Sequence, residues 1–225
     1  KSLKKKMKEK IISIINQKGG VGKTTTVINL AAGLSQNNKK ILVIDLDPQG
    51  NATTGLGLLN ISQSSNSIYE VLSGSKKIED VISKTKFSNL DIITSNVDLS
   101  GLEVETADDG RRAYILKEKL AAYLNDSREH YDYVLIDCPP SLSLLTVMAL
   151  VASHSLLVPL QTEFFALEGI TQLIKTIERI KVGLNPNLEI RGILLTMFDK
   201  RNKLSSEVEL DARNYFKEKV YKNVV

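Results

Sequence analysis

Lysine and glycine residues are concentrated in one short stretch near the start of the chain. From Lys18 to Thr25 the sequence reads Lys-Gly-Gly-Val-Gly-Lys-Thr-Thr. Glycines allow successive backbone N–H groups to turn toward one anion, and the N-terminus of a following helix adds about half a positive charge. Lys23 can reach the β- and γ-phosphates of a nucleotide, and the Thr24 hydroxyl can ligate Mg²⁺. The residues predicted to bind a nucleotide here are Lys18, Gly19, Gly20, Val21, Gly22, Lys23, Thr24 and Thr25.

The surroundings of this stretch distinguish a phosphate site from a glycine-rich turn without a ligand. The apolar run Ile11–Ile15 predicts a strand before it, and Thr24–Ser35 predicts a helix after it. Strand, loop and helix in this order are what a P-loop requires. The usual P-loop pattern has a glycine five positions before Gly22. This chain has Gln17 there, so the stretch is a variant of that pattern.

Three aspartates follow predicted strands directly. Asp45 and Asp47 come after Ile41–Ile44, and Asp137 comes after Tyr133–Ile136. Ligands of open α/β sheets bind at the carboxyl ends of the strands, so these carboxylates are expected beside the nucleotide. Each of them, taken singly, could instead cap the next element of structure. Together with the glycine-rich stretch they predict a Mg²⁺ site.

Short apolar runs alternate with amphipathic stretches along the whole chain. Strands buried on both faces read as continuous apolar runs, and their alternation with helices indicates an α/β fold with right-handed crossovers. The expected architecture is a three-layer sandwich, with helices on both sides of a mostly parallel, twisted sheet. Residues Gly50–Asn66 are rich in Gly, Asn, Ser and Thr and predict a mobile loop. The further predicted strands are Leu90–Thr94, Ser155–Val158 and Ile190–Thr196, and the further helices are Ile68–Ser73, Arg111–Leu124, Leu142–Val151, Leu167–Val182 and Ser205–Phe216.

The composition is that of an ordinary globular protein, with 225 residues, 42% of them hydrophobic and 25% charged. Residues 1–10 carry six lysines against one glutamate, which predicts a flexible basic segment, either solvated or in contact with a polyanion. Residues 11–225 are expected to form one domain. No run approaches 18 apolar residues, so no membrane partner is expected. The single cysteine, Cys138, fits a reducing cytoplasm and is interpreted as a small packing residue.

The stretch Asn16–Thr25 resembles the deviant Walker A loop of the ParA/MinD/Soj ATPases, which are P-loop proteins. Three further segments are typical of the ParA/Soj branch, and the resemblance spans Ile11 to Val220. It implies ATP and Mg²⁺ as cofactors and a homodimer that forms on ATP binding. Family members usually continue beyond the point where this chain ends, which predicts a truncation. The three segments are Tyr131–Leu142, Val158–Gly169 and Thr196–Ser205.

The resemblance also assigns roles to residues. Lys18 corresponds to the lysine that reaches across the dimer to the phosphates of the partner subunit. Asp47 corresponds to the residue that positions the attacking water, while Asp45 is expected to order the neighbouring loop. Asp137 corresponds to the residue that holds Mg²⁺ through water. The implied catalytic residues are Lys18, Lys23 and Asp47, the metal site is Thr24, Asp47 and Asp137, and Pro159 and Thr196 frame the nucleoside.

The function implied by the resemblance is an ATP-dependent switch in DNA segregation, in the cytoplasm and on the nucleoid. The ATP-bound dimer would bind DNA non-specifically through Lys200, Arg201 and Lys203, and a ParB-type centromere-binding protein would stimulate hydrolysis. A solvated charged loop explains the same three residues equally well from the sequence alone. The chain has no evident helix-turn-helix motif, so no sequence-specific reading of DNA is expected.

Two alternatives belong to other functional classes. A MinD-like regulator of division-site placement would associate with a membrane, although Asp47–Asn51 and Thr196–Ser205 fit the ParA/Soj branch better. A metabolic enzyme with the same fold would be a ligase or an electron carrier. A carrier with a shared iron–sulfur cluster needs two cysteines per subunit, and this chain has one.

Overall fold

The computed structural model describes residues 10–58, 65–126 and 130–225. The basic segment predicted at the N-terminus lies outside these residues, except for Lys10. The described residues form one seven-stranded sheet with the order β3-β4-β2-β5-β1-β6-β7, in which only the β3–β4 pair is antiparallel. The strands are β1 (Lys10–Ile14), β2 (Ile41–Asp45), β3 (Ile82–Lys84), β4 (Leu90–Ile93), β5 (Tyr133–Asp137), β6 (Ser155–Gln161) and β7 (Glu189–Thr196).

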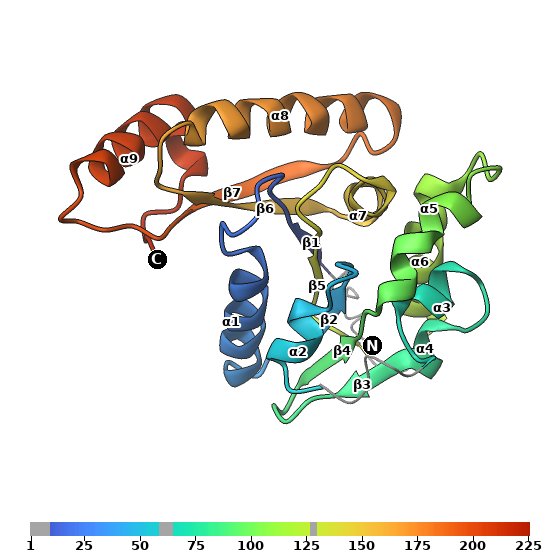
Figure 1. The fold of residues 1–225 in the computed structure, drawn as a ribbon. Coiled ribbons are helices and arrows are strands. Elements are labelled where there is room, and N and C mark those ends of the chain that lie inside the picture. Colours follow the sequence, from blue (N-terminus) through green and yellow to red (C-terminus); the bar gives the residue numbers. More distant parts are fainter. Residues whose placement is uncertain (1–9, 59–64, 127–129) are drawn as a thin grey trace, which may run out of the picture.

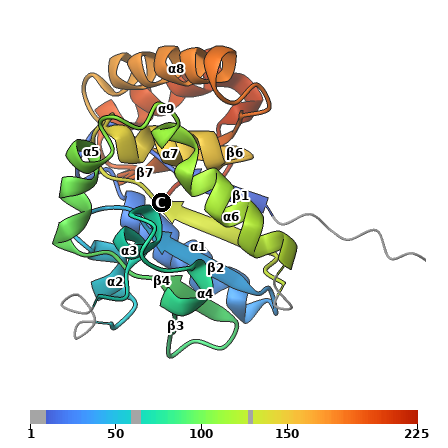
Figure 2. The same cartoon turned by 90° about the vertical axis from the view of Figure 1, so that its right-hand side faces the viewer.

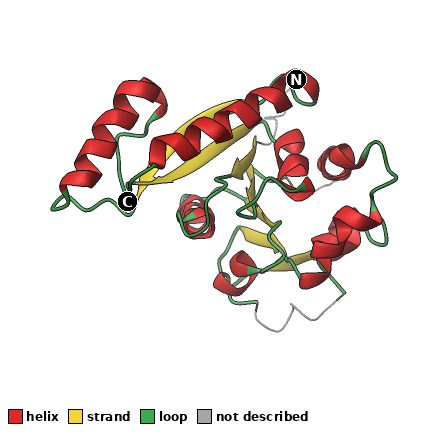
Figure 3. Ribbon diagram, turned by 45° about the horizontal axis from the view of Figure 1, so that its top comes forward, coloured by secondary structure: helices red, strands yellow, loops and turns green. Residues whose placement is uncertain are grey.

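Helices cover both faces of this sheet, as Figures 1 and 3 show. Helix α1 packs on one face, against Ile12, Val43 and Leu135. Helices α6 and α7 pack on the opposite face of β2 and β5, and Figure 2 shows α6 lying across it. Helices α8 and α9 cover β6 and β7 next to α7. The α-helices are α1 (Lys23–Gln36), α2 (Asn51–Gly55), α3 (Ile68–Leu72), α4 (Ile78–Val81), α5 (Leu102–Glu105), α6 (Ile115–Asp126), α7 (Leu144–Ala152), α8 (Ala166–Gly183) and α9 (Lys203–Phe216).

The predicted α/β sandwich is therefore confirmed, and its cause is visible in the burial of the strands. All five residues of β2 are buried, because alternate side chains face α1 on one side and the α6–α7 layer on the other. Helix α8 buries an apolar stripe, including Leu173, Ile177 and Ile180, against β6 and β7. Strand β2 is thus positioned by two layers of helices, which fixes where its C-terminal end lies.

The sequence-based expectations differ from the structure mainly in short elements. The stretch predicted as a mobile loop contains helix α2, so that prediction is wrong for Asn51–Gly55, and residues 59–64 lie outside the described part. The helix predicted from Arg111 begins as a 3-10 turn at Arg112–Tyr114 before α6. No helix among the described residues is long and apolar enough to span a membrane.

Candidate nucleotide-binding site

The glycine-rich stretch lies between β1, in the middle of the sheet, and the first turn of α1 (Figure 1). This confirms the strand–loop–helix context that the sequence predicts. Gly20 and Gly22 have φ values of 74° and 88°, in the left-handed region that side chains disfavour. Gly22 is also the N-cap of α1, so the loop delivers its backbone N–H groups to the positive end of the helix dipole.

Lys23 lies inside this loop rather than on its surface. Its side chain is buried, and Nζ donates a hydrogen bond of 2.8 Å to the carbonyl oxygen of Lys18. Burial lowers the pKa of Lys23, while the negative charges of Asp137 and Asp47 oppose this shift. The ammonium group is thus partly desolvated and hydrogen-bonded to an uncharged carbonyl oxygen. A phosphate group, which carries full negative charge, would be a stronger acceptor for it.

Asp137 and Thr24 form the part of the site that fits a divalent cation. The Thr24 hydroxyl donates to Asp137 Oδ2 at 2.7 Å, and Asp137 Oδ1 is buried without a hydrogen-bond partner in the described part of the chain. An orphaned carboxylate oxygen beside a hydroxyl is a donor set suited to Mg²⁺. The described residues contain no group of three or more His, Cys, Asp or Glu able to hold a metal. Such a cation would therefore also need oxygen ligands from a nucleotide or water.

The pKa of Asp137 is raised to about 7, first by burial and then by the charge of Asp45. Because the raised pKa favours the protonated native protein, proton binding at Asp137 contributes fully to the free energy of unfolding below about pH 4. It is lost as the pH rises through about 7.

We therefore expect Asp137→Asn to stabilise the nucleotide-free protein at pH 8, by roughly 1–3 kcal/mol, because the amide removes a buried negative charge. The difference from the natural chain should shrink as the pH falls and approach zero below about pH 4. Urea unfolding between pH 4 and 8 measures it, with the exposed Asp108→Asn as the control. A natural chain that is more stable than Asp137→Asn at pH 8 would contradict the assigned burial cost.

Asp45 is the last residue of β2, the strand next to β5, and Asp47 follows it. Asp45 is the register partner of Asp137, so the sheet itself aligns these carboxylates. Asp45 Oδ2 accepts hydrogen bonds from the backbone N–H (2.8 Å) and the hydroxyl (2.7 Å) of Thr53, and burial raises its pKa to about 6. Asp45 therefore anchors helix α2, in agreement with its expected role in ordering the loop.

Asp47 lies close to the cradle, the name we use for the phosphate-binding loop formed by Lys18–Thr25. Its backbone N–H donates to Asp45 Oδ1 at 3.2 Å, and its own Oδ1 accepts from the backbone N–H of Gln49 at 3.0 Å. The charge of Asp47 acts on both Lys23 and Asp137. The structure thus brings together one ammonium group and three carboxylates at the C-terminal ends of β1, β2 and β5.

Pro159 and Thr196 lie behind the loop, where both are buried. The Thr196 hydroxyl donates to the carbonyl oxygen of Val21 at 2.9 Å, and the side chain of Asn16 donates to the carbonyl oxygen of Pro159 at 2.7 Å. These contacts support the loop from the sheet side. Asn16 was not among the predicted site residues, although a polar residue at the end of a buried strand is a signal that could have found it.

Lys18 points away from the cradle. Its side chain forms an ion pair with Glu163, which follows β6. Sequence reasoning named Glu163 only within a longer segment. The pair joins the loop to the start of α8, so it links the site to a second part of the fold.

The three predicted DNA-binding residues lie between β7 and the start of α9, outside the cradle. Arg201 Nη2 contacts Asp199 Oδ2 at 2.9 Å, and Lys203 Nζ contacts Glu207 Oε1 at 3.7 Å. Both side chains remain at least 90% exposed. These contacts neutralise part of the local positive charge but leave the cations on the surface.

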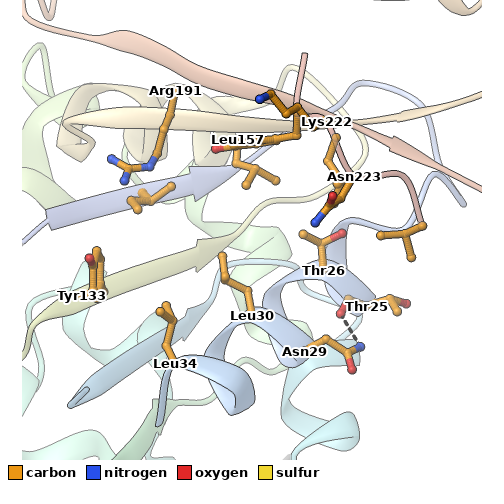
Figure 4. A pocket seen from close by; sticks show the side chains of 14 residues that line it. Thr25, Thr26, Asn29, Leu30, Leu34, Tyr133, Leu157, Arg191, Lys222 and Asn223 are labelled. Atoms are coloured by element: carbon orange, nitrogen blue, oxygen red, sulfur yellow. Dashed lines mark hydrogen bonds between the residues drawn. The ribbon is translucent and has the colours of Figure 1, made fainter. Parts of the chain in front are cut away.

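A separate cavity of about 760 Å³ lies between α1 and the sheet (Figure 4). Leu30, Leu34 and Leu157 line it, together with Tyr133, Arg191 and residues close to the end of the chain, and no acidic side chain of the described residues does. An apolar cavity without carboxylates does not suit a metal–phosphate complex. Thr25 lines this cavity, whereas Lys23 and Thr24 do not.

Comparisons with known proteins agree with this geometry. A family described as an AAA domain matches residues 9–190. The chromosome partitioning protein ParA of Caulobacter vibrioides is 50% identical over 96% of this chain and 80% of its own length. The sporulation initiation inhibitor protein Soj of Bacillus subtilis is 45% identical over 96% of this chain and 83% of its own length.

Two solved structures have the same fold. A plasmid partition protein from Borrelia burgdorferi is 30% identical, with a TM-score of 0.80 over 95% of this chain and 88% of that chain. A cobyrinic acid a,c-diamide synthase from Mycobacterium smegmatis, with a bound ATP analogue and magnesium, is 37% identical, with a TM-score of 0.86 over 93% of this chain and 84% of that chain. The shared fold thus occurs in proteins with different names.

Proposed function

Because this chain belongs to the ParA/Soj family of partitioning ATPases, we propose that it is an ATP-driven switch for DNA segregation. In the ATP-bound state two copies form a dimer that binds DNA non-specifically. Hydrolysis to ADP and phosphate returns the chain to a state with low affinity for DNA. The nucleotide then acts as a timer, since its binding shifts the population between monomer and dimer.

The observation that carries this function is the pairing of Thr24 with Asp137 directly beside the buried ammonium group of Lys23. A triphosphate with Mg²⁺ would provide the anion for Lys23 and the cation for the orphaned Oδ1 of Asp137. ATP and Mg²⁺ are the cofactors that fit these groups. Bound Mg²⁺ supplies charge neutralisation on the phosphate oxygens, which is the main electrostatic requirement of phosphoryl transfer.

The side chains of this chain have separate tasks in that reaction. Lys23 and the backbone N–H groups from Gly19 to Thr24 bind the phosphates and stabilise the charge that develops on them. Asp47 orients the attacking water, and its turn with Gln49 and its contact with Asp45 hold it in place. Lys18 is the residue that reaches the phosphates of a facing copy.

The DNA contact is assigned to Lys200, Arg201 and Lys203, which are exposed close to the C-terminal end of β7. The ion pairs of Arg201 with Asp199 and of Lys203 with Glu207 are easily replaced by phosphate contacts, because exposed ion pairs contribute only ~0–1 kcal/mol. Two copies in a dimer present six such cations. If each one contacts a phosphate, log K for DNA should fall with log salt concentration with a slope of about −5.

Replacing all three residues with alanine is expected to flatten this slope by at least half and therefore to weaken DNA binding by at least ~100-fold at 0.1 M salt. Fluorescence anisotropy with a labelled duplex, Mg²⁺ and a non-hydrolysable ATP analogue measures both quantities. The control is a variant in which three exposed lysines elsewhere are replaced with alanine, and it should keep the slope. The three lysines are Lys39, Lys117 and Lys175. An unchanged slope in the first variant would remove these residues from the DNA contact.

The likeness to the diamide synthase makes a ligase the second candidate. A ligase uses ATP to phosphorylate or otherwise activate a second substrate, whereas a switch releases only ADP and phosphate. Product analysis after incubation with ATP separates the two classes. The segregation role further predicts that a ParB-type partner raises the hydrolysis rate in the presence of DNA.

A further inference from the structure

Lys18 is bound within its own chain through both its backbone and its side chain. Its N–H donates to Asn16 Oδ1 at 3.0 Å, and its carbonyl oxygen accepts from Lys23 Nζ at 2.8 Å. Its own Nζ forms the ion pair with Oε1 of Glu163. The charge of Lys18 is therefore directed to the start of α8, although the side chain is 56% exposed and could reach a facing molecule.

Glu163 is held in a turn that is fixed to the sheet. Its N–H donates to the carbonyl oxygen of Gln161, the last residue of β6, at 3.0 Å, and its carbonyl oxygen accepts from the N–H of Ala166, the first residue of α8, at 3.2 Å. The neighbouring Thr162 donates its hydroxyl to the carbonyl oxygen of Met197 at 3.2 Å. The turn thus holds the carboxylate of Glu163 at a defined position, where it binds Lys18.

The surface beside this ion pair carries features of a contact region. Lys18, Glu163 and the aromatic residues Phe164 and Phe165 line a cavity of about 350 Å³. The two rings are 67% and 73% exposed, and Phe165 has a φ of 65°, which is costly for an aromatic residue. Exposed aromatic side chains on a strained backbone indicate a surface that another molecule covers in a different state.

We propose that Glu163 is a positioning residue that retains Lys18 within its own chain until a second copy with bound triphosphate displaces it. This inference rests on the proposed function, in which Lys18 acts across an ATP-bound dimer. The triphosphate offers several negatively charged oxygens, whereas Glu163 offers a single carboxylate. Lys18 therefore exchanges Glu163 for the phosphates of the facing copy, and Glu163 raises the nucleotide concentration at which the dimer forms.

The size of the effect follows from the exposure of the pair. An exposed ion pair changes an equilibrium constant by a factor of about 1.4 to 5. Formation of a symmetric dimer breaks two such pairs, so Glu163→Gln should lower the dimer dissociation constant by the square of this factor, roughly 2- to 25-fold. The gain should shrink as salt increases, because salt screens the ion pair in the natural chain.

The first measurement uses the nucleotide-free chain and does not depend on dimer formation. Lys18 is labelled with an amine-reactive reagent, and mass spectrometry follows the labelled peptide with time. We expect Glu163→Gln to label Lys18 several-fold faster than the natural chain. Glu168→Gln is the matched control, since Glu168 is exposed and lines the same cavity, and it should not change the rate. Equal rates in Glu163→Gln and the natural chain would overturn the inference.

The second measurement is sedimentation equilibrium with Mg²⁺ and a non-hydrolysable ATP analogue at several salt concentrations. Tighter dimers of Glu163→Gln than of the natural chain and Glu168→Gln support the retention of Lys18. Weaker dimers would overturn it, because Glu163 would then act across the interface. A natural chain that binds the analogue but stays monomeric contradicts the proposed dimer switch instead, and the labelling rate still decides whether Glu163 retains Lys18.

Discussion

The Lys23→Ala chain is expected to bind Mg²⁺-ATP at least 100-fold more weakly than the natural chain. The substitution removes an ammonium group that is buried inside the loop, together with its hydrogen bond to the carbonyl oxygen of Lys18. A charge-assisted contact to phosphate in a partly desolvated site is worth about 3 kcal/mol, which corresponds to this factor. Equilibrium titration with a fluorescent ATP analogue measures the change.

Two controls make this result specific to the cradle. Lys39→Ala removes an exposed lysine beyond the end of α1 and should leave the affinity unchanged. The thermal unfolding of nucleotide-free Lys23→Ala should stay close to that of the natural chain, because the substitution also relieves the burial of a charge. Unchanged ATP affinity in a folded Lys23→Ala protein would refute the assignment of this loop.

The Asp47→Ala chain is expected to bind ATP and to dimerise normally but to lose at least 100-fold in turnover. Asp47 is assigned to the attacking water, while the phosphate contacts come from the loop. Removing a positioned group of this kind typically costs a factor of 10² to 10⁴ in rate. Phosphate release under saturating ATP measures turnover, and analogue binding measured in parallel shows whether the cradle is intact.

A second substitution separates chemistry from local structure. The carboxylate of Asp47 accepts the N–H of Gln49, and alanine removes this turn contact as well as the charge. Asp47→Asn keeps an oxygen for the turn and removes only the charge, so it should be as inactive as Asp47→Ala. The exposed Asp108→Ala serves as the control. Normal turnover in Asp47→Asn would mean that the carboxylate is not needed for catalysis.

The larger elements of the fold could be predicted because their signals are redundant. Strand β2 is an unbroken apolar run, and helix α8 has an apolar stripe at helical spacing. Ser67 and Glu70 form a capping box that also marks the start of α3 in the sequence. The patterns of β2 and α8 reflect burial against neighbours on known sides, which is the property that periodicity reports, whereas the capping box reflects local hydrogen bonds.

The short elements depend on contacts between distant residues and therefore left no local signal. Helix α2 has five residues of low apolar content, and it is held by two hydrogen bonds from Thr53 to the buried carboxylate of Asp45. Strand β3 has three residues and gains order only by pairing with the edge of β4. Such elements are set by tertiary contacts that override local propensity.

The same distinction applies to the site. The cradle could be predicted because its glycines, Lys23 and Thr24 are close together in the sequence, so that a local pattern is enough to indicate phosphate binding. The support from Pro159 and Thr196, and the ion pair of Lys18 with Glu163, join residues more than 140 positions apart. Only the order of the strands, with β1 between β5 and β6, brings these residues together.

We expect the loop between β1 and α1 to bind a nucleoside triphosphate together with Mg²⁺. Isothermal titration calorimetry of the natural chain with a non-hydrolysable ATP analogue measures this binding. We expect one bound analogue per chain with Mg²⁺ and an affinity at least tenfold lower when a chelator removes the cation. Folded protein that takes up no triphosphate in the presence of Mg²⁺ would contradict this expectation.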